Sequence, residues 1–353
     1  MQKTRVLVLW THISGYLSSS LKALAEDGME IFLVAYHPKN SAPFSSKLMD
    51  WIPESNKIFL AEGESLTLLN QNLIKIFNPN ILLCAGWSNR QFINIAKSLH
   101  KSCFKVITFD TQLTLSLKQN LGRIWFKIQL LKIFNCAFVP GDRQLRTAIF
   151  FGFKEKNVLM GSYVPDNNSV IVVNHEAIRS NNRFIFVGRL VEEKGIKFLV
   201  DAYKVYRRRS SSPWPLYVAG VGPLSDLFKI EGVIHLGFME SEMLFKEMKA
   251  SSCLIAPSIY EPWGVQISEA TSLGLPVIAT TACGAAAHLV RSNFNGHLIA
   301  PKDSAGLAQA MFEISTMDNL VEFSKNSYSL SRQYTPSIWA KTLSQAYAKF
   351  RNM

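Results

Sequence analysis

The sequence predicts an α/β protein made of two doubly wound domains, each a parallel sheet with helices on both faces. Three observations carry this prediction. The chain has 353 residues, which is too long for one ordinary hydrophobic core and suits two domains. Short apolar runs alternate with helical stretches through both halves of the chain, and a polar segment rich in turn-forming residues separates the halves.

The first half contains five short apolar runs that predict strands. These runs lie at 5–10, 30–35, 81–85, 105–109 and 136–139. Helices are expected between them, near 14–26, 64–77, 89–100 and 118–133. Because alternating strands and helices connect parallel strands by crossovers, we expect one sheet with helices on both of its faces.

The second half repeats the same rhythm. Its expected strands lie at 184–187, 216–219, 233–236, 254–256 and 277–279. An apolar stripe at i, i+3, i+4 and i+7 predicts a helix directly after Gly195. The stripe consists of Ile196, Leu199, Val200 and Tyr203. A shorter amphipathic helix is expected at 240–250, which completes a second doubly wound domain.

The domain boundaries follow from the polar segment 166–182, which is rich in turn formers and too polar to be core. This segment is the expected linker. An N-terminal domain then covers 1–165, and a C-terminal domain covers 183–335. The last segment, 336–353, carries apolar residues at helical spacing and is expected to be a helix.

The composition limits the class of protein. A formal net charge of +12 indicates an anionic partner, which is nucleic acid, anionic lipid or an acidic substrate. No nucleic-acid-binding motif accompanies the charge, so nucleic acid is the least favoured. The five cysteines show no zinc-site spacing and are expected to be reduced core thiols. No apolar run reaches the roughly 18–20 residues of a membrane span, and the chain starts with a strand, so we expect a cytoplasmic protein.

The segment 118–132 combines basic residues with apolar residues at helical spacing. The apolar residues are Leu121, Ile124, Trp125, Ile128 and Leu131. One interpretation is a helix that lies on an anionic membrane surface, as in a peripheral protein of the inner face of the membrane. The other is a core-facing helix whose lysines reach into water, which is the commoner arrangement and is slightly favoured.

The segment 258–270 carries the strongest functional signal, because it places Glu261 and Glu269 around Gly264 where a loop gives way to a helix. Pro262 excludes a helix before this point, and a second glycine ends the helix ten residues after Gly264. A helix start presents backbone N–H groups and partial positive charge, which suit a phosphate or sugar hydroxyls. Two acidic acceptors beside it favour a sugar nucleotide over a bare anion.

In this context Glu261 and Glu269 resemble the paired-glutamate motif of retaining glycosyltransferases of the GT-B fold, family 4, also called glycosyl transferases group 1. The stretches 183–196 and 274–303 are similar to the same family, and the resemblance is specific over about 183–303. It implies two Rossmann-like domains that face each other across a cleft. It also implies a C-terminal helix that returns to the N-terminal domain.

The resemblance implies that Arg189 and Lys194 neutralise a leaving nucleoside diphosphate. Both residues follow the strand that ends at Gly188, so the two cations can converge on one diphosphate as its charge develops. The alternative is an ordinary surface turn. It is less favoured because Gly188 and Gly195 bracket the cations where a close backbone approach would be useful.

The resemblance also assigns roles to the paired glutamates. Glu269 is expected to accept hydrogen bonds from the ribose hydroxyls, and Glu261 is expected to lie by the transferred sugar and its anomeric carbon. Either glutamate alone would be interpreted as an acid that complements the helix dipole. The backbone N–H groups of Gly264, Val265 and Gln266 are expected to meet sugar hydroxyls or phosphate.

The remaining candidates carry weaker signals. Phe238 follows a strand end and is expected either to cover the nucleobase or to be core. The turn with Gly220 and Gly222 resembles the family's glycine turn but lacks the acid often found there. Gly15 begins the first helix, where backbone N–H groups could reach the diphosphate. Asp110 ends a strand and either orients a sugar or the incoming hydroxyl, including as a base, or caps the next helix.

No Asp-x-Asp pair is present to hold a divalent ion, so neither a metal nor a cofactor is expected, and the nucleoside-diphosphate sugar is a substrate. The resemblance favours front-face transfer with retention to a hydroxyl of a glycan or lipid-linked glycan, in building a bacterial surface polysaccharide such as lipopolysaccharide. A nucleotide-sugar epimerase or hydrolase of the same fold and a non-catalytic binding subunit are the alternatives. A dinucleotide dehydrogenase is least favoured, because no Gly-x-Gly-x-x-Gly follows the first strand.

Overall fold

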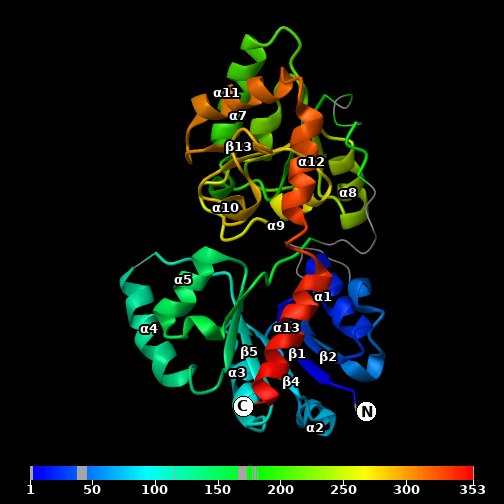
Figure 1. Ribbon diagram of the computed structural model, residues 1–353, viewed down its shortest axis with the longest axis vertical. Coiled ribbons are helices and arrows are strands. Elements are labelled where there is room, and N and C mark those ends of the chain that lie inside the picture. The colour runs from blue at the N-terminus through cyan, green and yellow to red at the C-terminus, as the bar shows by residue number, and fades with distance from the viewer. Residues whose placement is uncertain are drawn as a thin grey trace. The chain divides into compact units, whose positions relative to one another are not determined.

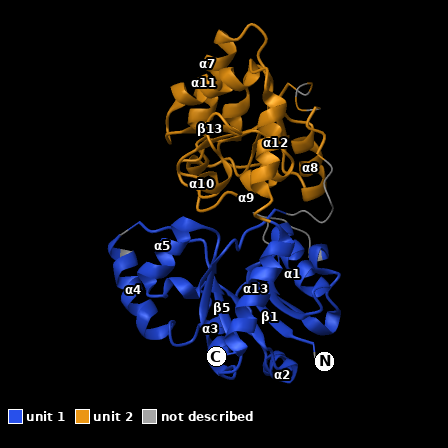
Figure 2. Cartoon of the chain, in the orientation of Figure 1, with its two compact units in different colours: residues 1–166, 335–353 blue, residues 167–334 orange. Residues whose placement is uncertain are grey.

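The computed structural model describes residues 3–37, 46–114, 116–165, 173–176, 178, 180 and 182–352. The chain forms two compact units (Figure 2). Unit 1 consists of Met1–Asp166 together with Thr335–Met353, and unit 2 consists of Asn167–Tyr334. Most of the expected linker 166–182 lies outside the described residues.

Unit 1 is built on a seven-stranded parallel sheet with the order β3-β2-β1-β4-β5-β6-β7. Its strands are β1 (Arg5–His12), β2 (Glu30–Tyr36), β3 (Lys57–Leu60), β4 (Ile81–Ala85), β5 (Phe104–Thr108), β6 (Cys136–Val139) and β7 (Val158–Met160). Its helices are α1 (Gly15–Glu26), α2 (Leu68–Phe77), α3 (Arg90–Ser98), α4 (Leu117–Gln129), α5 (Asp142–Phe151) and α13 (Pro336–Arg351). The expected parallel α/β architecture is confirmed for this unit.

Two strands of this sheet, β3 and β7, were not expected from the sequence. They have four and three residues, and they are the two edges of the sheet. A short edge strand is covered on fewer sides than a central one, so its apolar run is brief and partly exposed. The signal that reveals a central strand is therefore weak in β3 and β7.

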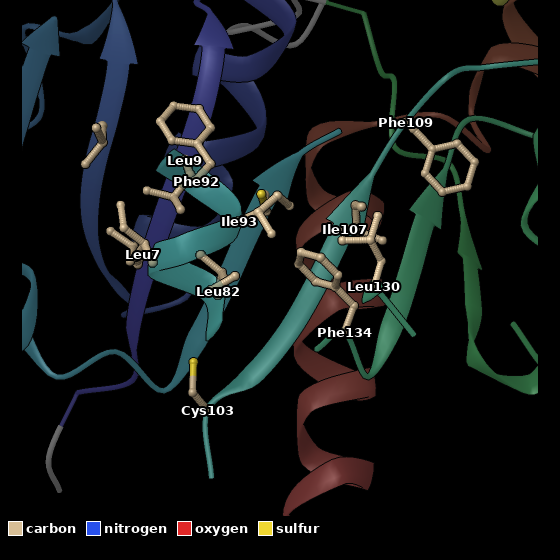
Figure 3. Close-up of a cluster of buried hydrophobic side chains, with 14 of the residues drawn as sticks. Leu7, Leu9, Leu82, Phe92, Ile93, Cys103, Ile107, Phe109, Leu130 and Phe134 are labelled. Atoms are coloured by element: carbon tan, nitrogen blue, oxygen red, sulfur yellow. The ribbon is translucent and has the colours of Figure 1, made fainter. Parts of the chain in front are cut away.

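The core of unit 1 fills the space between the sheet and its helices (Figure 3). Phe92 and Ile93 of α3 pack in the same cluster as Leu7 of β1 and Leu82 of β4. Every one of these side chains is at least nine-tenths buried. Central strands buried on both faces read as continuous apolar runs, which is why their positions were predicted closely.

The expected core-facing stripe of the 118–133 helix is wrong for most of its residues. Leu121, Ile124, Trp125 and Ile128 are exposed on α4. The helix instead packs against the core through Phe126 on its opposite face, and Leu130 at its end is also buried. Periodicity finds an amphipathic helix but does not say which of two apolar faces meets the core, so the wrong face was chosen.

Unit 2 is built on a six-stranded parallel sheet with the order β10-β9-β8-β11-β12-β13. Its strands are β8 (Phe184–Val187), β9 (Leu216–Ala219), β10 (Val233–Gly237), β11 (Cys253–Ala256), β12 (Val277–Thr280) and β13 (Gly296–Ile299). Its helices are α7 (Ile196–Arg209), α8 (Ser241–Lys249), α9 (Val265–Ser272), α10 (Ala286–Leu289), α11 (Ser304–Ser315) and α12 (Leu320–Ser331). The second Rossmann-like domain is confirmed.

The helix α7 shows how the sequence pattern becomes packing in unit 2. All four residues of the predicted stripe are buried in the core of this unit. Gly195 directly precedes the helix with a φ of 71°, in the left-handed region that glycine adopts without a steric penalty. The helix therefore begins where the sequence predicts and presents its apolar stripe to the sheet.

The C-terminal helix α13 belongs to unit 1, where it packs beside α1 (Figure 1). Trp339 of α13 is buried, and its indole N–H donates a hydrogen bond of 3.2 Å to the carbonyl oxygen of Ser162. Its ring stacks on Phe138 of β6. These contacts fix the end of the chain to the first sheet.

Over the described part of the chain, every helix is too short or too polar to traverse a lipid bilayer.

Candidate functional site

The loops that carry the candidate residues of unit 2 gather at one edge of its sheet. In a parallel sheet all strands end at the same edge, and ligands of such sheets bind beyond the carboxyl ends of the strands. Gly188 follows β8, Gly220 follows β9, Phe238 follows β10, and the loop with Glu261 follows β11. The candidates of unit 2 therefore share one edge of one sheet.

The Glu261 loop is held against the turn that carries the cations. The N–H groups of Ile259 and Tyr260 both donate to the carbonyl oxygen of Glu193, at 2.8 and 3.2 Å. A Cβ added to Gly195 would lie only 2.0 Å from the carbonyl oxygen of Pro257. Gly195 is therefore required because two backbones meet there, and the loops that follow β8 and β11 are in direct contact.

A second glycine holds the other side of the same loop. The N–H of Gly284 donates to the carbonyl oxygen of Glu261 at 3.1 Å, and that of Ala285 donates to the carbonyl oxygen of Trp263 at 2.8 Å. A Cβ on Gly284 would lie 2.1 Å from the carbonyl oxygen of Pro262. The loop is thus fixed from both sides, so its backbone geometry is set before any ligand binds.

The central interaction of the site is an ion pair between Lys194 Nζ and Glu261 Oε2. Only 13% of the lysine side chain and 11% of the glutamate side chain are exposed, so both charges are largely withdrawn from water. The side-chain amide of Gln266 lies 3.5 Å from the same carboxylate oxygen. The sequence predicted all three residues for the site, and the structure brings them together.

Arg189 lies in a different environment from Lys194. Its side chain is 64% exposed and forms an ion pair with Glu193, four residues further along the turn. The two cations thus have separate carboxylate partners, one exposed and one buried. Their convergence on one diphosphate stays a prediction.

The helix α9 begins at Val265, as the sequence predicts. Gly264 precedes it with a φ of 99°, a left-handed conformation that a residue with a Cβ adopts only at a cost. Val265 and Gln266 form the first turn, and Glu269 lies further along α9 with an intermediate exposure. The ribose-binding role of Glu269 stays a prediction.

The glycine turn after β9 has a structural explanation. A Cβ on Gly220 would lie 1.9 Å from the carbonyl oxygen of Gly188, and one on Gly222 would lie 2.5 Å from that of Leu190. Both glycines therefore allow this turn to pack on the turn after β8. The N–H of Gly220 also bonds the carbonyl oxygen of Gly237 at 2.7 Å, next to Phe238, which is 44% exposed. Its exposure contradicts the interpretation of Phe238 as core.

Burial keeps the thiol of Cys283, beside this site, in its neutral form. Cys283 is fully buried, and its backbone forms an isolated parallel β-bridge with the backbone of Glu261. Burial raises the pKa of the Cys283 thiol, and the charge of the nearby Glu261 adds to the rise. The thiol is therefore a packing group and not a thiolate at neutral pH.

In unit 1, Gly15 and Asp110 lie at the carboxyl edge of the first sheet. Gly15 is the first residue of α1, and the hydroxyl of Ser14 caps the helix by accepting a 3.4 Å hydrogen bond from the N–H of Leu17. Asp110 follows β5 but does not cap the next helix, because Ser116 caps α4. The helix-cap interpretation of Asp110 is therefore wrong, and its role toward a sugar stays a prediction.

Two tyrosines that the sequence analysis missed connect Gly15 and Asp110. The hydroxyl of Tyr163 lies 3.3 Å from Asp110 Oδ2, and its ring packs on Tyr16 with 4.9 Å between centroids. Burial raises the pKa of the Tyr163 phenol well above its usual range, and Tyr16 and Asp110 add to the rise. Both phenols stay protonated, since burial also raises the pKa of Tyr16. Tyr163 lies beyond the last strand of its sheet, where no motif marks it.

The two Rossmann-like units, each with its candidate residues at the carboxyl edge of a parallel sheet, define a protein of the GT-B fold. Residues 181–316 match the family model described as Glycosyl transferases group 1. The matched residues include the paired glutamates, Glu261 and Glu269, and the two candidate cations, Arg189 and Lys194.

Curated relatives match over part of their length. An uncharacterised glycosyltransferase of Methanocaldococcus jannaschii is 34% identical over 133 residues, which are 35% of this chain and 33% of that protein. Lipopolysaccharide 1,6-galactosyltransferase of Escherichia coli is 26% identical over 165 residues, which are 43% of this chain and 44% of that protein. In these two comparisons the chain therefore matches 33% and 44% of the length of the relatives.

A solved structure matches over nearly the whole chain. HepE of Anabaena, in complex with UDP and glucose, has a TM-score of 0.70 and 15% sequence identity, and the match covers 98% of this chain and 100% of that one. At this identity the likeness bears on the fold.

Proposed function

We propose that this protein is a retaining glycosyltransferase that moves a sugar from a nucleoside-diphosphate sugar to a hydroxyl of a glycan or lipid-linked glycan. The observation that carries the proposal is the buried ion pair of Lys194 with Glu261 beside the start of α9. A sugar diphosphate needs a cation for its phosphates and an acceptor for its hydroxyls. This pair supplies both groups, and the Glu261 loop is held in place by close backbone contacts at Gly195 and Gly284.

The leaving group explains the cations. When the bond between the anomeric carbon and the phosphate oxygen breaks, negative charge collects on that oxygen, and a fixed cation stabilises it more in the transition state than in the ground state. Lys194 is the buried cation. Arg189 lies on the same turn, and because its pair with Glu193 is exposed, its side chain could change rotamer to contact the diphosphate. The diphosphate would compete with Glu261 for Lys194.

The sugar and the nucleoside take the remaining groups. Once the diphosphate engages Lys194, Glu261 is available to accept hydroxyl hydrogen bonds and to stabilise positive charge at the anomeric carbon. Gly264, Val265 and Gln266 lie at the start of α9, and their N–H groups would bind sugar hydroxyls or phosphate. Glu269 would hold the ribose. Phe238 is exposed where it could cover the base.

The transfer step is written as a front-face displacement with retention. The oxygen of the acceptor hydroxyl bonds to the anomeric carbon on the face that the phosphate oxygen leaves. The hydroxyl proton passes to that phosphate oxygen, so the products are a glycoside and a nucleoside diphosphate. Asp110, with Tyr163 as its hydrogen-bond donor, would orient the acceptor hydroxyl or the sugar. The cations replace a metal, so the activity is expected to survive EDTA.

Surface polysaccharide synthesis at the cytoplasmic face of the membrane is the proposed setting. It draws support from the similarity to the E. coli enzyme named for lipopolysaccharide. The UDP and glucose in the Anabaena protein support a UDP-sugar donor.

A thermal-shift panel of sugar nucleotides on the wild type and on Glu269→Ala tests the donor site. Because a ligand that binds only the folded state stabilises it by mass action, the correct donor raises the melting temperature, and the variant loses most of that rise. Incubation of the donor with and without glycan acceptors then separates the activities. A transferase makes a glycoside with the donor's anomeric configuration, whereas an epimerase alters the sugar with no acceptor present. No shift with any donor would refute the proposal.

A further inference from the structure

Helix α4 exposes a continuous apolar face, and none of the residues of this face belongs to the core cluster in the described part of unit 1. The face consists of Leu117, Leu121, Ile124, Trp125 and Ile128, whose exposed fractions lie between 46% and 85%. Their spacing of i, i+4, i+7, i+8 and i+11 puts them on one stripe of the helix. Monomeric proteins rarely leave so many large apolar side chains together in water, so this face indicates a partner.

The exposed face is additional to the packing of the helix. Phe126 on the opposite face is buried against the core, and Arg123 stacks over the ring of Phe150 at 4.8 Å. Ser116 caps the helix start by accepting from the N–H of Gln119. The helix is therefore capped and fixed to unit 1 through one face while it presents a second apolar face outward.

Charge around α4 points to the kind of partner. Between Asp110 and Asp142 the chain has no acidic residue, and its basic residues there are Lys118, Arg123, Lys127 and Lys132. Lys127 and Lys132 are exposed. A second copy of this face would bring like charges together, which disfavours a symmetric dimer through it. Nucleic acid would satisfy the charges but leave the apolar stripe in water.

We propose that the exposed face of α4 inserts into the interfacial region of an anionic lipid bilayer. The apolar stripe would enter the boundary between headgroups and acyl chains, and the lysines would meet the negative headgroups. Trp125 suits that boundary, because its ring is apolar while its indole N–H can donate a hydrogen bond to water or headgroups. The binding itself does not require the proposed activity. Only its use, to keep a lipid-linked acceptor within reach, rests on the proposed function.

Vesicle flotation with the full chain tests the proposal. The wild type is expected to bind vesicles of phosphatidylcholine with phosphatidylglycerol at least about tenfold more than phosphatidylcholine alone, and the excess is expected to fall with added salt. The paired substitutions Lys127→Glu and Lys132→Glu should lower binding to anionic vesicles at least about tenfold. Ile124→Gln with Ile128→Gln should lower it to a similar extent.

Helix α2 of the same unit provides a matched control. It also exposes large apolar residues, Leu69 and Ile76 among them, but it has a single basic residue, Lys75, and follows Glu62 and Glu64. Leu69→Gln with Ile76→Gln should leave vesicle binding within about twofold of the wild type. Equal loss in the α2 and α4 variants, or equal binding of the wild type to neutral and anionic vesicles, would overturn the assignment.

Two further measurements keep the outcome clear. All variants should melt within a few degrees of the wild type, because the substituted side chains are exposed. Sedimentation without vesicles tests the dimer, and a dimer that Ile124→Gln with Ile128→Gln abolishes would refute the membrane assignment. The sugar-nucleotide thermal shift is measured without lipid. Loss of that shift with intact vesicle binding rejects the proposed function alone, and the converse rejects the membrane face alone.

Discussion

Lys194 and Glu261 form an ion pair across 67 residues of sequence, between the loops that follow the adjacent strands β8 and β11. Both side chains are nearly withdrawn from water, and the loop between the glutamate and β11 is bonded to the turn that carries the lysine. A buried pair of this kind leaves an uncompensated charge when one partner is removed. A ligand with its own negative charge can replace the glutamate, which is why the proposed function places the diphosphate at this pair.

Glu261→Gln should separate donor binding from turnover. The substitution leaves Lys194 without its counter-charge, so the free energy of unfolding should fall by about 3–5 kcal/mol. A bound nucleoside diphosphate can supply the missing charge, so donor binding should hold or tighten, while turnover should fall by about 100-fold or more. Calorimetric titration with the donor, thermal unfolding and product formation measure the three effects.

Glu192→Gln is the matched control for this change. Glu192 pairs with Lys197 in the same unit, but both side chains are more than half exposed. Surface pairs contribute little to stability, so this variant should melt and turn over like the wild type. Equal losses in the two variants would mean that the Lys194 pair has no special role.

Gly284→Ala should disturb the Glu261 loop without touching any charged group. The added Cβ would meet the carbonyl oxygen of Pro262 at 2.1 Å, so the two backbones must move apart. Overpacking of this kind costs about 1–3 kcal/mol, and the shift of the loop should weaken donor binding. Unfolding by urea and the donor-induced thermal shift report the two effects.

Gly122→Ala gives the opposite expectation for the same chemical change. This glycine lies inside α4, and a Cβ there would have no neighbour within 4 Å. Alanine should therefore stabilise the protein by about 0.5–1 kcal/mol, because it favours helix and lowers the entropy of the unfolded chain. If Gly284→Ala proved as harmless, the close backbone contact between Gly284 and Pro262 would not hold the Glu261 loop in place.

The strands β6, β8 and β9 have the bounds that their apolar runs predict. They are central or nearly so, and a buried strand reads as an unbroken apolar run. The edge strands β3 and β7 were not predicted, because their apolar runs are short and partly exposed. Local pattern is thus enough for the interior of each sheet, whereas at the edges it found β10 and missed β3 and β7.

The site was predictable as a set of residues but not as a set of contacts. The motifs named Lys194 and Glu261 separately, and only the parallel order of β8 and β11 brings them together. Tyr163 had no motif, since its role depends on the meeting of the last loop of a sheet with Asp110. The face of α4 was misassigned because periodicity alone cannot rank two apolar faces of one helix.

The buried thiols predict a loss of stability in alkali. Burial raises the pKa of Cys84, Cys103 and Cys136 to about 12, from 9.0. Between these values the unfolded chain releases protons that the folded protein keeps, so the free energy of unfolding should be largest below pH 9 and fall as the pH rises toward 12. Urea midpoints at pH 8 and pH 10 measure this. A higher midpoint at pH 10 would contradict the burial of these thiols.

Tyr163→Phe should reveal whether Asp110 takes part in the reaction. The change removes the phenol that bonds Asp110 Oδ2 and keeps the ring that packs on Tyr16, so the melting temperature should change little and turnover should fall about tenfold. Tyr36→Phe, which removes a phenol bonded to Asn89, is the control and should keep full turnover. In an Asp110→Asn background, Tyr163→Phe should have no further effect, because its influence passes through that carboxylate. An additive loss in the double variant would mean that Tyr163 acts on the substrate itself and does not position Asp110.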